Sequence, residues 1–147
     1  MFSKDFKEFI ELLNKNDVRY LVVGGYAVAF HGHPRYTKDM DVWIDLSPAN
    51  AGKLSQALGE FGFGSLNLTP DDFLEADQII QLGYPPNRID ILTSCTGLDF
   101  DDCYRAKVDF NMDGVRVQFI DIESLKKNKR STGRTQDLAD AENLMEP

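Results

Sequence analysis

The sequence predicts an α/β (α+β) domain with a mixed, partly antiparallel sheet flanked by helices. Two pairs of strand patterns, within residues 78–92 and 107–120, have the spacing of β-hairpins. A helical segment that starts at Ser47-Pro48 serves as the crossover to the later strands. The chain has 147 residues, of which 42% are hydrophobic, so we expect one packed domain over residues 1–147.

The first half of the chain predicts two helices and two strands around a glycine turn. Apolar residues recur at i, i+3, i+4 and i+7 within Phe6–Leu13, as in an amphipathic helix. Leu21–Val23 is a short apolar strand, and Gly24-Gly25 ends it. Tyr26–Phe30 favours a short helix, and the β-branched and aromatic run Val42–Ile44 is typical of a strand.

The second half predicts two hairpins and three further helical segments. Asp113-Gly114 is a favoured hairpin turn, and it joins the strands of the second hairpin. Residues 99–106 are expected to be helical, and Asp121 opens another helix. A last helix is expected over residues 137–144, with Leu138 facing inward.

Asp39 and Asp41 flank Met40 at the start of the Val42–Ile44 strand. Residues i and i+2 of a strand share one face, so both carboxylates point the same way. Two such charges repel unless a cation lies between them. Carboxylate oxygens suit Mg²⁺ or Mn²⁺, which binds through one or two carboxylates plus substrate phosphates. The alternative is a pair of solvated aspartates at a strand end.

Gly24 and Gly25 predict a place where a phosphate can approach the backbone. Glycine adopts positive φ and has no Cβ, and the N–H groups that open the following helix suit an anion. The alternative is an ordinary strand-to-helix turn. Neither G-x-x-x-x-G-K-[ST] nor G-x-G-x-x-G follows this strand.

This order of motifs resembles a known superfamily. Gly-Gly, then Asp-x-Asp on an apolar strand, then a lone Asp on a later strand is similar to the nucleotidyltransferases with a DNA polymerase β type of core. More narrowly, His31-Gly32, Arg35-x-Thr37-x-Asp39 and the C-terminal segment resemble small prokaryotic proteins related to the AbiEii toxin nucleotidyltransferases. The resemblance implies a minimal nucleotidyltransferase fold.

The superfamily pattern asks for a third carboxylate, and Asp90 is the candidate. It alternates with isoleucines in Arg88–Leu92, so it shares a face with Arg88. The alternative is an edge-strand aspartate paired with Arg88 or with solvent. The resemblance implies that Asp39 and Asp41 hold the metal on the triphosphate. It also implies that Asp90 helps to bind a second metal and accepts the proton of the attacking hydroxyl.

Positive charge concentrates near the C-terminus of this acidic protein. Five cations occupy nine positions, and they are Lys126, Lys127, Lys129, Arg130 and Arg134. They could hold phosphate or RNA, or they could be a solvated helix end. The resemblance favours Lys126 and Arg134 as phosphate ligands. Arg35, four residues before Asp39, is a further phosphate candidate, with an exposed surface arginine as the alternative.

Several other features narrow the expectation. The net charge of −8 argues against broad, sequence-blind coating of nucleic acid. Cys95 and Cys103 lack metal-ligand spacing, and we expect reduced thiols in a cytoplasmic protein. The charged start lacks the apolar core of a signal peptide, and no apolar run is long enough for a membrane span. By strand parity Trp43 shares the carboxylate face, where it either lines a pocket or packs in the core.

The expected function is transfer of a nucleoside monophosphate from an NTP to a hydroxyl acceptor with Mg²⁺ or Mn²⁺. The resemblance implies RNA, tRNA or a protein side chain as acceptor, and a toxin–antitoxin or phage-defence context in which an antitoxin or another protein is the partner. The first alternative is an inactive nucleotide-binding or partner-binding module on the same fold. The second is an interaction protein without a ligand.

Overall fold

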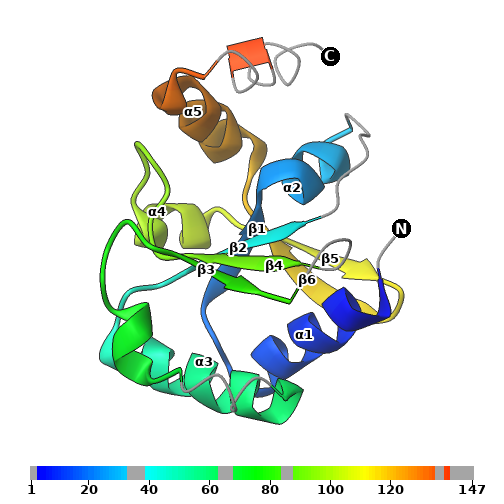
Figure 1. The fold of residues 1–147 in the computed structure, drawn as a ribbon. Helices are drawn as coiled ribbons and strands as arrows, with labels where there is room; N and C mark the ends of the chain where they lie inside the picture. Colours follow the sequence, from blue (N-terminus) through cyan, green and yellow to red (C-terminus); the bar gives the residue numbers. More distant parts are fainter. Residues whose placement is uncertain (1–2, 33–38, 63–67, 84–87, 135–137, 140–147) are drawn as a thin grey trace.

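A six-stranded mixed sheet forms the centre of the computed structural model, which describes residues 3–32, 39–62, 68–83, 88–134 and 138–139 (Figure 1). Its strand order is β3-β4-β2-β1-β6-β5. Both predicted hairpins are present, as β3–β4 and β5–β6. The strands are β1 (Tyr20–Val23), β2 (Met40–Ile44), β3 (Ile79–Leu82), β4 (Ile89–Leu92), β5 (Val108–Met112) and β6 (Val115–Phe119).

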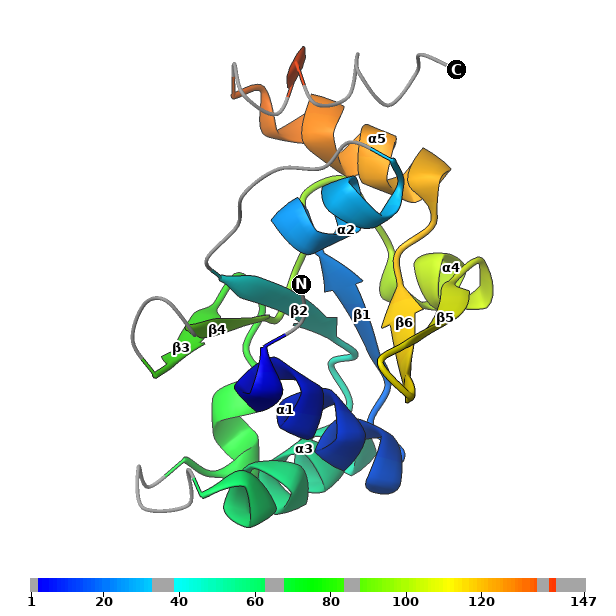
Figure 2. The same ribbon diagram turned by 90° about the vertical axis from the view of Figure 1, so that its right-hand side faces the viewer.

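Helices cover both sides of this sheet (Figures 1 and 2). Helices α1 and α3 lie together on one side, whereas α2 and α5 lie on the other. The mixed, helix-flanked architecture that the sequence predicts is therefore confirmed. The helices are α1 (Lys4–Lys15), α2 (Gly24–Phe30), α3 (Pro48–Phe61), the 3₁₀ turn η2 (Pro70–Phe73), α4 (Phe100–Arg105) and α5 (Ile122–Thr132).

The predicted start and stop signals act as expected. The Ser47 side chain accepts a hydrogen bond from Asn50 N at 3.2 Å, and Pro48 occupies the first turn of α3. Gly62 ends this helix with a φ of +96°, where a Cβ would add strain. Asp113 and Gly114, with φ of 52° and 85°, form the turn between β5 and β6.

The central strands bring distant parts of the chain together. β1 pairs with β2 antiparallel, and β2 pairs with β4 in parallel through the crossover that contains α3. In this parallel pair Asp41 and Asp90 are direct partners. β4 lies between β3 and β2 and is therefore not an edge strand. The alternative interpretation, in which Asp90 lies on an edge strand, is wrong on this point.

The last predicted helix falls largely on residues outside those described. Leu138, expected to face inward, is instead 46% exposed. The prediction for Leu138 was wrong because an apolar residue in a helical pattern is not always buried in the core. Within the described ranges, no helix has the length and apolar character that a membrane crossing requires.

Candidate active site

Gly24 lies where β1 ends and α2 begins, and its backbone runs close to Asp41. Its φ of +66° is in the region that favours glycine. A Cβ here would overlap Oδ2 of Asp41 and lie 3.0 Å from its Cγ. Val23, directly before the glycine, is the register partner of Asp41. Gly24 therefore leaves the space that the Asp41 carboxylate takes, which is a role the sequence did not predict. Phosphate binding by Gly24 and Gly25 stays a prediction.

Asp90 and Asp39 are joined by one guanidinium. Arg88 Nε donates to Asp90 Oδ1 at 3.0 Å, and Nη2 donates to Asp90 Oδ2 at 3.1 Å. The same Nη2 donates to Asp39 Oδ2 at 2.8 Å. The pairing of Asp90 with Arg88, which the sequence left open, is therefore present. Together with the partnership of Asp41 and Asp90, it brings the three predicted carboxylates to one place.

The crowding of these acids changes the proton affinity of Asp41. Burial raises the pKa of Asp41 from its usual 3.8 to about 7, and the charges of Asp90 and Asp39 add to this effect. Lys129 acts in the opposite direction. A cation bound beside Asp41 would favour its ionised form.

These residues fit Mg²⁺ or Mn²⁺ by donor type. All donors are carboxylate oxygens, and burial together with the charges of Asp90 and Asp39 raises the pKa of Asp41. No group of three or more His, Cys, Asp or Glu side chains in the described part of the chain has a ready-made metal-binding arrangement. The Arg88 guanidinium bonds to both Asp39 and Asp90 instead. Arg88 therefore bonds to carboxylate oxygens that a divalent ion would also bind.

Asp41 makes the stability of the metal-free protein depend on pH. The folded chain keeps the Asp41 proton up to about pH 7, whereas the unfolded chain loses it near pH 3.8. The free energy of unfolding therefore falls as pH rises between these values. We expect Asp41→Asn to stabilise the protein at pH 8 by a few kcal/mol, and much less at pH 4. Urea unfolding in EDTA at both pH values measures this, and an equal effect at both would contradict it.

Lys129 is the residue near the acids that the sequence did not single out. It is only 8% exposed, and its charge lowers the pKa of both Asp41 and Cys95. Lys126, chosen as the phosphate ligand, instead places Nζ 3.3 Å from Glu123 Oε1. The helical spacing could have indicated that Lys129 is buried, because Lys129 follows the fully buried Leu125 by one turn. A charged residue on a buried stripe indicates a partner inside the protein.

For the nucleotide transfer that the sequence predicts, we expect Lys129→Met to lower the rate at least tenfold, because it removes a desolvated cation beside the acids. The exposed Lys127, two positions earlier on α5, provides the matched control as Lys127→Met. Transfer rates from labelled NTP measure both variants. Equal losses in the two would show that only the overall charge of α5 matters.

The phosphate roles predicted for Arg134 and Arg35 stay predictions. Arg134 follows α5 and lines a cavity of about 280 Å³ with Asn128, Thr132 and the β4 residue Leu92. Leu92 is two residues beyond Asp90, so this cavity borders the strand that carries the third acid. Arg35 falls in a range that the structure does not describe, and its role stays a prediction.

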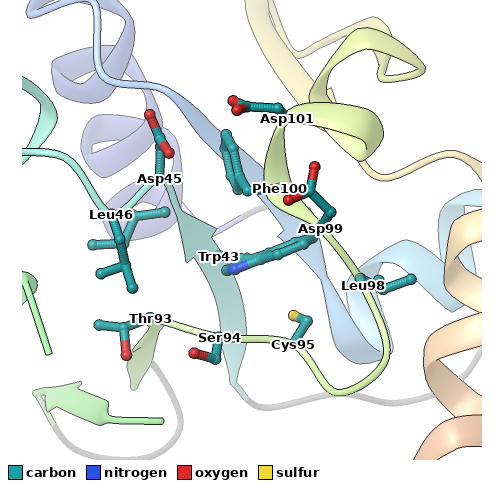
Figure 3. A pocket seen from close by; sticks show the side chains of 11 residues that line it. Trp43, Asp45, Leu46, Thr93, Ser94, Cys95, Leu98, Asp99, Phe100 and Asp101 are labelled. Atoms are coloured by element: carbon teal, nitrogen blue, oxygen red, sulfur yellow. The ribbon is translucent and has the colours of Figure 1, made fainter. Parts of the chain in front are cut away.

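A second cavity, of about 260 Å³, lies farther along β2 (Figure 3). Trp43 lines it and also packs edge-to-face on Phe100 with ring centroids 5.0 Å apart. Both roles considered for Trp43 are therefore present. Asp45 and Asp101 at this cavity are each paired with Arg19, at 2.8 and 2.9 Å. Their charges are compensated without a ligand.

The contacts and burial of His31, Cys95 and Cys103 indicate structural roles for these side chains. His31 Nε2 lies 2.8 Å from the carbonyl oxygen of Ile120, which fixes the end of α2 against the chain after β6. Cys95 and Cys103 are free thiols, and burial raises the pKa of both. Such thiols are poor nucleophiles at neutral pH.

Comparison with known proteins identifies the fold. No protein-family profile matches the chain, and no curated protein matches its sequence. A candidate nucleotidyltransferase from Thermotoga maritima superimposes with a TM-score of 0.64 and 14% identity over 97% of this chain and 94% of the other. An antigenic nucleotidyltransferase-like protein from Paracoccidioides brasiliensis gives a TM-score of 0.55 and 14% identity, over 98% and 76%. The chain thus has the nucleotidyltransferase fold, and the narrower resemblance to AbiEii-like proteins stays a prediction.

Proposed function

We propose that this chain, built on the nucleotidyltransferase fold, is a metal-dependent enzyme that transfers a nucleoside monophosphate from an NTP to a hydroxyl acceptor. The observation that carries the proposal is the convergence of Asp39, Asp41 and Asp90 beside the backbone of Gly24. Acids brought together by two parallel strands, one of which has its pKa raised by burial and by the charges of the others, form a site that a divalent cation would stabilise.

Each residue then has a definite task. Asp39, Asp41 and Asp90 would hold Mg²⁺ or Mn²⁺, which supplies charge neutralisation at the attacking and leaving oxygens. Gly24 and Gly25 would face the triphosphate, and Lys129 would add positive charge at the same place. A carboxylate oxygen of Asp90 would accept the proton of the acceptor hydroxyl. The acceptor oxygen forms a bond to the α-phosphorus while the bond from that phosphorus to the β-phosphate bridging oxygen breaks, and pyrophosphate leaves.

The acceptor belongs to the same proposal. RNA, including tRNA, and protein side chains are the acceptors to test, since both offer hydroxyl groups. A toxin–antitoxin or phage-defence module, with an antitoxin as partner, is the proposed context, in line with the resemblance of the Arg35-x-Thr37-x-Asp39 motif. Transfer to either acceptor uses the same three acids.

The test is incubation of the protein with each α-³²P-labelled NTP and Mn²⁺ or Mg²⁺, with an RNA pool or a protein pool as acceptor. Label transferred to one pool, and lost in EDTA, supports the proposal and identifies the acceptor class. Nucleotide binding also stabilises the folded chain, by about 2.7 kcal/mol at 100 times Kd. A thermal shift without transfer to RNA, to protein or to the chain itself would identify the inactive binding module. Absence of both a thermal shift and nucleotide transfer would instead support the second alternative, an interaction protein that binds no nucleotide.

A further inference from the structure

Arg88 is the cation that is hydrogen-bonded to two of the three acids. Its guanidinium uses Nε and Nη2 to bond to both oxygens of Asp90 and to Oδ2 of Asp39, at 2.8 to 3.1 Å. The Arg88 side chain is 28% exposed, whereas those of Asp90 and Asp39 are 11% and 30% exposed. The guanidinium thus lies nearer the solvent than the Asp90 carboxylate and bonds to oxygens that a metal would also bind.

A divalent ion and this guanidinium compete for the same two carboxylates. Both are positive and both bind carboxylate oxygens, and Arg88 already bonds to both oxygens of Asp90 and to one oxygen of Asp39. Close approach of the two cations in a partly buried site is unfavourable, because the repulsion is screened less than in water. Metal binding on these acids therefore favours release of Arg88.

The strands do not need the Arg88 side chain to stay in register. The carbonyl oxygen of Arg88 accepts a hydrogen bond from Met40 N at 3.1 Å, so the backbone already joins β2 and β4 beside the acids. An Arg88 side chain that only held the two strands together, which we call a static tie, would add little to the backbone hydrogen bonds between them. The register of β2 and β4 therefore does not depend on the Arg88 side chain alone.

We propose that Arg88 is an exchangeable counter-ion of the site. It neutralises Asp39 and Asp90 while no metal is bound, moves away when the divalent ion arrives, and then binds a phosphate oxygen of the NTP. A guanidinium fork suits phosphate as well as it suits carboxylate, and the metal–triphosphate brings phosphate oxygens close to the acids. This inference rests on the proposed function and adds Arg88 to the nucleotide-binding residues.

Two binding measurements on Arg88→Met give effects of opposite sign. Mn²⁺ binding without nucleotide, followed by electron paramagnetic resonance, should become about fivefold tighter or more because the competitor is gone. Binding of Mn²⁺ with a non-hydrolysable NTP, followed by calorimetry, should become about tenfold weaker because a phosphate ligand is lost. A static tie predicts that both affinities stay the same or weaken together, and that result would overturn the inference.

Arg19→Met is the matched control. Arg19 also bridges two aspartates, Asp45 and Asp101, at 2.8 and 2.9 Å, but on the cavity of Figure 3 and not at the three acids. Its replacement should leave both affinities within about twofold of wild type, because exposed charges at a distance are screened. Equal effects of the two substitutions would mean that only net charge matters.

The wild-type protein gives an independent readout if the variant does not fold. The ¹⁵N-edited Nε–H signal of Arg88 should shift when Mg²⁺ saturates the site and shift again when the NTP analogue is added, while the Arg19 signal stays in place. An Arg88 signal unmoved by saturating Mg²⁺ would overturn the inference alone. Failure of the wild type to bind either Mg²⁺ or nucleotide would overturn the proposed function as well.

Discussion

Asp39→Asn, Asp41→Asn and Asp90→Asn should each lower metal-dependent nucleotide transfer by about 10³-fold. An amide keeps the size of the carboxylate but removes the negative charge that holds a divalent ion, and the lost stabilisation of several kcal/mol in the transition state corresponds to this factor. Single-turnover transfer from labelled NTP at saturating Mn²⁺ measures the loss. The double replacement of Asp39 and Asp41 should also weaken nucleotide binding, since the metal links protein and triphosphate.

The control is Asp109→Asn, which changes the same charge on the exposed strand β5. Its transfer rate should stay within about twofold of wild type, because a distant surface charge is screened. Thermal unfolding separates loss of activity from loss of fold. A transfer rate unchanged by Asp90→Asn would show that Asp90 has no role in the mechanism. The pairing of Asp41 with Asp90 in the parallel strands would then be structural only.

Gly24→Ala should both destabilise the fold and abolish transfer. An alanine at φ +66° costs about 1–2 kcal/mol in the left-handed region, and its Cβ would also overlap the Asp41 carboxylate. We expect a total loss of more than about 2 kcal/mol in the free energy of unfolding. Relief of the overlap requires Asp41 to move, which separates it from Asp90. Urea unfolding and the transfer assay measure the two effects.

Gly133→Ala isolates the backbone part of this cost. Gly133 has a similar φ of +72°, but nothing lies within 4 Å of the position its Cβ would take. Its replacement should therefore show the conformational strain without the overlap. In an Asp41→Ala background the cost of Gly24→Ala should fall toward that of Gly133→Ala. If the cost does not fall, the carboxylate is not what excludes a side chain at Gly24.

Local patterns were enough to predict most elements of this fold. The helix that Ser47-Pro48 opens and the turn at Asp113-Gly114 depend on a few neighbouring residues, whose preferences are strong. Strand parity correctly placed Asp90 and Arg88 on one face. The exposure of Leu138 shows that a helical pattern alone does not place an apolar residue in the core.

The contacts that define the candidate site could not be predicted in this way. The bond from Arg88 to Asp39 joins residues 49 positions apart and exists only because β4 pairs with β2. Alternation within β4 says nothing about which strand lies beside it. Lys129 was one of five cations for which phosphate binding and a solvated helix end both stayed open, whereas its spacing from Leu125 indicates a buried position. The close approach of Gly24 to Asp41 likewise depends on register between β1 and β2.

The parallel pairing of β2 with β4 also decides when the site can exist during synthesis of the chain. The glycine turn and the first two acids emerge from the ribosome before α3, whereas Asp90 emerges only with β4. Because contacts between distant segments form late, a nascent chain that ends within α3 carries an incomplete set of acids and no guanidinium to balance them. The three acids can therefore meet only after the segment through Leu92 has left the exit tunnel.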